Sequence, residues 1–135
     1  MKLRQQPTAQ YVGSSKVILR LLNGKNGKRL RNEYPSVWLG CASSINPKTD
    51  ANGEIALDAS QVQPRTIRVL GNDYVDCRPR GSNKLAPTNV SYSLDEIIAK
   101  GIVTENNCGK YCVDPIPGVL VLFLCPKTLS EKWEL

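Results

Sequence analysis

Apolar and polar residues alternate along the first half of the chain, with the two-residue period of strands that bury one face. In 16–22 this alternation places Val17, Leu19 and Leu21 on one side. Three further stretches have the same period and are predicted as strands, namely 36–41, 54–57 and 66–70. The residues expected on their buried sides are Val37, Leu39, Cys41, Ile55, Leu57, Ile67 and Val69, with Trp38 on the opposite side.

A polar turn at 48–57 organises these strands. Asp50 and Asn52 are able to bond their own backbone, and Gly53 adopts a positive φ without steric cost. The chain is therefore expected to reverse here and to enter the third strand in a fixed register. Two Asn-Gly pairs, at 23–24 and 26–27, are expected to end the first strand in the same way.

The second half of the chain contains one predicted helix, at 93–100. Ser93 and Glu96 have the spacing of a capping box, and Gly101 is a typical residue to end a helix. The apolar stripe that would hold the helix against the sheet is Leu94, Ile97 and Ile98. The stretches 78–88 and 102–117 have no period and are predicted as loops.

The stretch 118–125 is apolar on both faces, which is what a central strand covered on both sides requires. A second capping-box spacing, Thr128 to Glu131, indicates a terminal helical turn that lays Leu129 and Trp133 on the sheet. The fold class predicted from these elements is mainly β, an Ig-like β-sandwich with one short helix.

The chain has 135 residues, the size of one domain. Residues 1–15 are polar and without period, and they are expected to form a flexible arm ahead of a single domain at 16–135. No apolar run approaches the roughly 18 residues of a membrane helix. The first residues lack a secretory signal, so we expect either a cytosolic protein or an exported one whose signal has been removed.

Cysteine content favours the exported alternative. Five cysteines occur without any histidine, which is unusual for a zinc protein or a thiol enzyme and common in exported disulfide proteins. The candidates are Cys41, Cys77, Cys108, Cys112 and Cys125. A bond between Cys77 and Cys108 is the first choice because it would close a long loop, with Cys112 as the alternative partner. Cys41 and Cys125 lie on predicted strands and either pair or pack as small apolar residues.

The net charge of +6 is concentrated near the N-terminus. Six basic residues have no acidic residue between them, namely Lys16, Arg20, Lys25, Lys28, Arg29 and Arg31. Such a patch attracts anionic polymers or membrane surfaces, but a solvated hairpin with lysines that discourage edge pairing has the same composition. Nucleic-acid binding is not expected, because Tyr34 is the only aromatic residue close to the patch.

We expect no enzymatic activity, no metal and no cofactor. Without histidine, a Ser or Cys nucleophile lacks its usual base, and no known nucleophile or phosphate-loop motif occurs. Cys108 and Cys112 lack the second ligand pair of a zinc site. Asp50, Asn52 and Glu54 resemble part of a calcium loop but lack its remaining ligands.

The order of these motifs is similar to that of the carboxypeptidase regulatory-like domain. The resemblance covers about residues 16–76 and lies in Asn-Gly-Lys-Asn-Gly-Lys-Arg-Leu at 23–30 and Thr-Asp-Ala-Asn-Gly-Glu-Ile at 49–55. Arg29 stands where that family usually has Pro, and Ile55 replaces its usual aromatic residue. The resemblance implies a transthyretin-like, or prealbumin-like, β-sandwich that serves as a non-catalytic module in exported and cell-surface proteins.

An enzyme branch of the transthyretin-like fold hydrolyses 5-hydroxyisourate with histidines and a C-terminal Tyr-Arg-Gly-Ser. This chain has no histidine and ends Lys-Trp-Glu-Leu, so it lacks the residues of that enzyme branch.

From the cysteine content and the resemblance together, we expect a secreted, periplasmic or cell-surface module for protein binding or assembly. One alternative is a fibre subunit whose N-terminal arm adds a strand to a neighbour's sheet edge. Another is a basic adaptor for an anionic polymer.

Overall fold

A computed structural model describes residues 15–77 and 90–126 of the chain. The predicted arm, the loop at 78–88 and the terminal helical turn therefore lie outside the described residues, apart from Ser15. The elements are β1 (Lys16–Asn23), β2 (Ser36–Leu39), β3 (Glu54–Asp58), β4 (Thr66–Leu70), β5 (Tyr74–Asp76), β6 (Tyr92–Ser93), α2 (Leu94–Ala99), β7 (Ile102–Val103) and β8 (Val119–Pro126). In the described ranges, no helix is long and apolar enough to cross a membrane.

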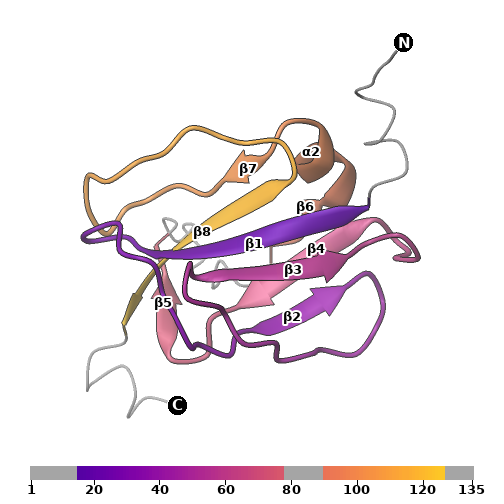
Figure 1. Cartoon of the computed structure of the whole chain (residues 1–135), viewed down its shortest axis with the longest axis horizontal. Coiled ribbons are helices and arrows are strands. Elements are labelled where there is room, and N and C mark those ends of the chain that lie inside the picture. Colours follow the sequence, from indigo (N-terminus) through magenta and orange to yellow (C-terminus); the bar gives the residue numbers. More distant parts are fainter. Residues whose placement is uncertain (1–14, 78–89, 127–135) are drawn as a thin grey trace.

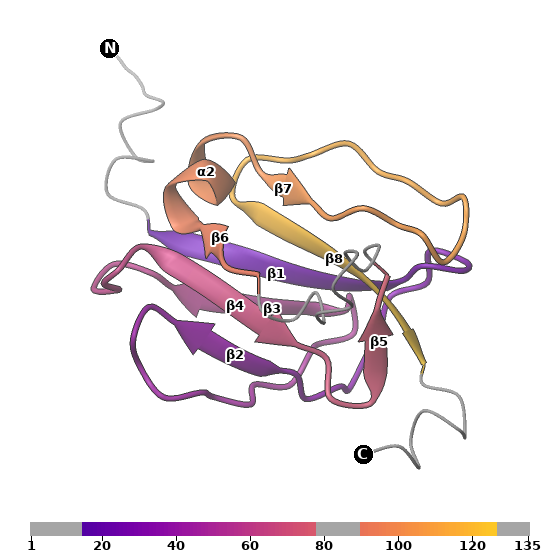
Figure 2. The ribbon, with the colours of Figure 1, turned by 180° about the vertical axis from the view of Figure 1, so that it is seen from behind.

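The described strands form two sheets, and the chain is a β-sandwich. The larger sheet has the order β3-β1-β8-β5, with β7 also paired to β8, and the smaller one has the order β2-β4-β6. Strands β1 and β8 run parallel in the middle of the larger sheet, and Figure 1 shows them side by side. Figure 2, from behind, brings β2 and β4 of the smaller sheet to the front.

The main core lies between the two sheets and includes the residues that the alternation predicted for the buried sides of β1, β3 and β4. Val17, Leu19 and Leu21 of β1 are at most 1% exposed. They pack with the inward residues of the other strands, which are Val37, Ile55, Leu57, Ile67, Val69, Leu120, Leu122 and Leu124. The two-residue period therefore identified the buried faces of β1, β3 and β4 correctly.

Strand β8 is buried on both faces, as its composition predicted. Its second face packs into a smaller cluster on the outer side of the larger sheet, formed by Leu22, Cys77, Val119, Val121 and Phe123. The segment 104–117 covers this cluster: Thr104 accepts a hydrogen bond from the Phe123 amide at 3.2 Å, and Val113 packs against the cluster. The larger sheet thus has a core on each side of its central strand.

The predicted helix is present and is one residue shorter at each end. The Ser93 hydroxyl accepts a hydrogen bond from the Glu96 amide at 3.1 Å, which confirms the N-terminal cap. Gly101 has a φ of +82°, and its amide donates to the Ile97 carbonyl at 2.9 Å, which ends the helix. Leu94 and Ile97 are fully buried and hold the helix on the main core.

The turn before β3 has the hydrogen bonds predicted for Asp50, but not one from the Asn52 side chain within the described residues. The Asp50 carboxylate accepts from the amides of Asn52 and Glu54, at 2.8 and 3.0 Å. Gly53 has a φ of +71°, and a Cβ there would lie 3.0 Å from the Leu21 carbonyl oxygen. Glycine is therefore required at this position for two reasons, the positive φ of the backbone and the close approach of β1.

Two expectations about strands were wrong. The strand predicted at 36–41 ends at Leu39, because Gly40 turns the chain with a φ of +60°, and Cys41 is exposed instead of facing inward. The segments that contain β5, β6 and β7 were not predicted as strands. These three strands have two or three residues each, which is too few for a two-residue period to be recognised. They form because they hydrogen-bond to the longer strands β8 and β4.

Replacement of Phe123 by Ala tests whether the outer cluster is a true core. Phe123 is 1% exposed, so loss of its ring should lower the free energy of unfolding by about 3 to 5 kcal/mol in urea denaturation. Ile116→Ala is the control, because that side chain is 46% exposed, and it should change stability by less than about 0.5 kcal/mol. Equal effects of the two substitutions would contradict a packed outer cluster.

Candidate functional site

A disulfide joins Cys77, directly after β5, to Cys108 in the segment that covers the outer cluster. The two Cα atoms are 5.4 Å apart, and 31 positions separate the residues in sequence. This bond is the pairing that loop closure favoured. It fastens the covering segment to the larger sheet.

The loops around the disulfide interlock through glycines. A Cβ on Gly24 would lie 2.7 Å from the Cys77 sulfur, and one on Gly109 would lie 2.6 Å from the Gly24 carbonyl oxygen. The Asn106 amide group donates to the carbonyls of Gly24 and Tyr111, both at 2.8 Å. We call this unit the interlocked tip and define it as residues 23–28, Cys77 and 106–111. Figures 1 and 2 show the two loops meeting at one end of the molecule.

Tyr111 completes the interlocked tip. Its ring lies over Gly27, where a Cβ would approach the ring carbons to 2.5 Å. The same ring meets Phe123 edge-on, with ring centroids 6.2 Å apart and an interplanar angle of 71°. Tyr111 nevertheless remains 42% exposed, so it presents an aromatic surface to the solvent.

The other three cysteines are unbonded. Cys41 and Cys112 are exposed, and Cys125 is half-buried against the outer cluster. The alternative of a bond between Cys41 and Cys125 is therefore wrong, and Cys112 does not replace Cys108. Within the described residues, no group of three or more His, Cys, Asp or Glu side chains is placed to hold a metal ion.

The six basic residues of the predicted patch have different surroundings. Arg20 and Arg29 both reach Glu54 of β3, with shortest distances of 2.7 and 3.6 Å between nitrogen and carboxylate oxygen. Lys16 stands opposite Asp58 at the far end of the same strand pair. The Ser60 amide donates to the Asp58 carboxylate at 2.9 Å and lowers the pKa of Asp58, and the Lys16 charge lowers it further.

The remaining three, Lys25, Lys28 and Arg31, are exposed, and no ion pair involves them among the described residues. Lys25 and Lys28 belong to the interlocked tip. Lys110, which the sequence did not single out, joins them there because Gly109 packs against Lys25: a Cβ on Gly109 would lie 3.1 Å from the Lys25 Cα. No sequence signal predicts that contact between residues so far apart along the chain.

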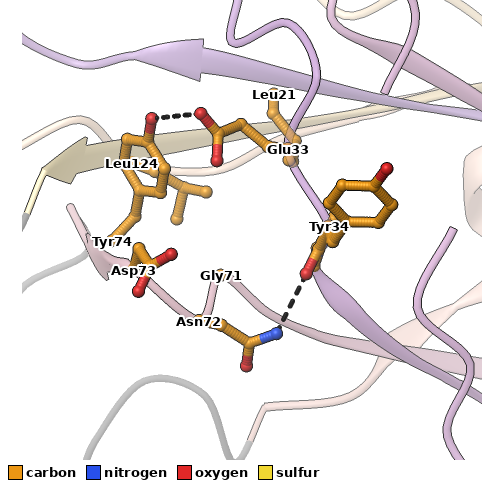
Figure 3. A pocket seen from close by; sticks show the side chains of 9 residues that line it. Leu21, Glu33, Tyr34, Gly71, Asn72, Asp73, Tyr74 and Leu124 are labelled. Carbon is orange, nitrogen blue, oxygen red and sulfur yellow. Dashed lines mark hydrogen bonds between the residues drawn. The ribbon is translucent and has the colours of Figure 1, made fainter. Parts of the chain in front are cut away.

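A small cavity lies between the start of β5 and the segment that leads into β2 (Figure 3). Its volume is about 80 Å³, and its walls include Leu21, Leu124, Gly71, Glu33 and Asp73. Sites for small organic molecules usually measure about 300 to 1,000 Å³. This cavity therefore accommodates a few water molecules or the end of one side chain, and not a typical substrate.

The cavity contains a hydrogen bond that sequence reasoning did not anticipate. The Tyr74 hydroxyl donates to the Glu33 carboxylate at 2.8 Å, across 41 positions of sequence (Figure 3). Burial, followed by this hydrogen bond and the Glu33 charge, raises the pKa of Tyr74 from 10.0 to about 12. Asn72 closes the opposite side by donating to the Tyr34 carbonyl at 2.9 Å.

Strand β3 is an edge of the larger sheet, which bears on the fibre alternative. Gly53 bonds to Leu21 of β1, and Ala59 bonds to Ser15 directly before it. Because residues of an antiparallel pair alternate between bonded and unbonded positions, Glu54, Ala56 and Asp58 point their backbone groups away from β1. Asp50 already occupies both outward groups of Glu54, through its own amide and its carboxylate. In the described part of the chain this leaves Ala56 and Asp58 to receive an added strand, which is a short edge.

The sequence matches no family model, no curated protein and no solved structure. The resemblance to the carboxypeptidase regulatory-like domain therefore stays a prediction carried by the motifs at 23–30 and 49–55. The function has to be inferred from the surfaces of this chain.

Removal of the disulfide should destabilise the protein strongly. For a loop of this length, loss of the cross-link in a Cys77→Ser, Cys108→Ser variant should cost about 3 to 4 kcal/mol. Cys112→Ser, which removes an exposed thiol, is the control and should have an effect below about 0.5 kcal/mol. Urea unfolding under non-reducing conditions measures both, and a double variant as stable as the control would contradict the fastening role.

Tyr74 should make stability fall at alkaline pH. The folded protein keeps the phenol proton to about pH 12, whereas the unfolded chain releases it near 10, so the free energy of unfolding should decrease as pH rises between these values. Tyr74→Phe should flatten this decrease and remove one late-ionising tyrosine from an ultraviolet absorbance titration. Glu33→Gln should move that ionisation toward lower pH. An unchanged titration in Tyr74→Phe would assign the late ionisation to another tyrosine.

Proposed function

We propose that this chain is an exported β-sandwich of transthyretin-like type that serves as a non-catalytic module for protein binding or assembly. The observation that carries the proposal is the disulfide at the interlocked tip. Disulfides of this kind persist in oxidising compartments and are rare in the cytosol. The motifs shared with the carboxypeptidase regulatory-like domain support the same location and role.

The arrangement of the covering segment supports binding through an exposed surface. The segment 104–117 is held by Thr104 at its start and by Cys108 in the middle. After its end, the Gly118 amide donates to the Ile97 carbonyl at 2.7 Å, directly before β8. A long loop fixed on a rigid sheet is where recognition usually occurs. Two of its large side chains, Tyr111 and Ile116, are 42% and 46% exposed, although the loop itself is held in place.

A hollow of about 310 Å³ beside Leu39, Asp58 and Gln61 is large enough for a small molecule, but Asp58 is the only ionisable residue that lines it. The cavity beside Tyr74 does not favour catalysis either. At about 80 Å³ it is well below the size of a usual substrate pocket. The Glu33 carboxylate that lines it is engaged by the Tyr74 hydroxyl, so this pair has a structural role.

Thiol counting combined with site-specific cross-linking tests the proposal. Alkylation of the unfolded, unreduced protein from its natural source should label three of the five cysteines, and five labels would exclude the exported disulfide form. A photo-cross-linking residue at Ile116 should then give one protein adduct, a partner or a second copy. The same residue at Val90, an equally exposed position outside the covering segment, is the control. Absence of an adduct at Ile116, together with sedimentation as a monomer, would overturn the binding role.

A further inference from the structure

Three lysines from two distant segments gather at the interlocked tip. Lys25 and Lys28 lie in the turn after β1, and Lys110 lies in the covering segment. The backbones touch where a Cβ on Gly109 would be 3.1 Å from the Lys25 Cα, and Lys110 follows Gly109 directly. All three side chains are exposed. The fold therefore assembles a basic surface that is not continuous in the sequence.

The charges of these lysines are not neutralised within the described part of the protein. Arg20, Arg29 and Arg65 each have a carboxylate partner within 3.6 Å, whereas no ion pair involves the three lysines among residues 15–77 and 90–126. The flanking acids Glu105 and Asp114 are exposed and make no ion pair with them in these ranges. Like charges held together repel, so the covalent and hydrogen-bonded frame has to hold them in place.

That frame fixes the backbone beneath each lysine. The Asn23 side chain accepts from the Lys25 amide at 2.9 Å, and the Asn26 side chain accepts from the Lys28 amide at the same distance. Beside Lys110, Asn106 bridges the two loops and Cys108 is covalently tied to Cys77. The basic surface is therefore preorganised, which lowers the entropic cost of binding a partner.

Tyr111 adds an aromatic surface next to Lys110. Its ring is held between Gly27 and Phe123 and still exposes part of its area. An aromatic ring beside ammonium groups suits a ligand that carries anionic groups together with a flat face, either the C–H face of a sugar ring or a nucleic-acid base. The charges here come from lysine and not from arginine, which is the preferred residue for nucleic-acid recognition, so the sugar is favoured. Lysines are flexible, hydrated point charges, which suit repeated anionic groups better than the planar, two-pronged recognition of arginine.

We propose that the interlocked tip is a binding site for acidic polysaccharides. Lys25, Lys28 and Lys110 pair with successive anionic groups of the polymer, and a sugar ring packs on Tyr111. Tyr111 belongs both to this site and to the covering segment, so the two proposals are tested at different residues, the lysines for the polysaccharide and Ile116 for the protein contact. The test of the lysines does not depend on the identity of a protein partner.

Two triple variants with equal charge test the lysines. Lys25→Ala, Lys28→Ala, Lys110→Ala removes the tip charges, and Lys16→Ala, Lys48→Ala, Lys100→Ala removes three exposed charges elsewhere. The probe is a heparin fragment, measured by calorimetry at several salt concentrations on oxidised full-length protein. The tip variant should bind about tenfold more weakly with a smaller salt dependence, and the matched variant should stay within about twofold. Equal weakening of both variants, or no binding by the unmodified protein at low salt, overturns the proposal.

Other polymers decide whether the ligand is a polysaccharide. Neutral dextran should not bind, and poly-glutamate and duplex DNA should bind more weakly than heparin per charge. Tighter binding of poly-glutamate would assign the tip to an acidic protein segment, and tighter binding of DNA would assign it to nucleic acid; either result overturns the polysaccharide. Tyr111→Leu should weaken heparin binding by about threefold without a change in salt dependence. An unchanged affinity overturns the stacking contact.

Discussion

The burial of β8 on both faces is the constraint on which the rest of this structure depends. A strand that is apolar on both sides needs cover on both sides, and the three-stranded sheet supplies it on only one. The second face is covered by the segment 104–117. The short strand β7 directly before this segment pairs with β8, but the segment itself contains no strand. Ordering a loop costs a large conformational entropy. The disulfide and the hydrogen bonds of Asn106 and Thr104 offset this cost and hold the cover in place.

The need to cover the second face of β8 also determines where the covering segment is attached and where charge is exposed. The covering segment is fixed against the turn after β1. Gly109 lets the two backbones come into contact, whereas Gly24 and Gly27 leave room for side chains of the covering segment, among them the Tyr111 ring. This contact brings Lys110 beside Lys25. At the β3 edge, by contrast, Arg20 and Arg29 form ion pairs with Glu54. One basic sequence cluster is thus divided between a strand face, where two arginines share one carboxylate, and a loop tip whose lysines have no ion pair within the described residues.

Local signals predicted the parts of the fold that depend on local interactions. The period of β1, the Asp50 turn, the Ser93 cap and the two-sided character of β8 are each determined within a few residues, and the structure confirms them. The disulfide was predicted by loop length. The end of β2 at Leu39 was missed because Gly40 outweighs the strand pattern, and β5 was missed because its ladder comes entirely from β8.

The candidate surfaces were harder to predict than the fold because they depend on contacts between distant residues. Glu33 meets Tyr74 across 41 positions, and Asn106 meets Gly24 across 82. Neither contact is associated with a sequence spacing from which it could be predicted. The cluster of basic residues was visible in the sequence, but its division by Glu54 and its extension by Lys110 follow from strand pairing and loop packing. In a chain with a disulfide-fastened loop, composition therefore indicates that charge is present, and the covalent frame decides where that charge is displayed.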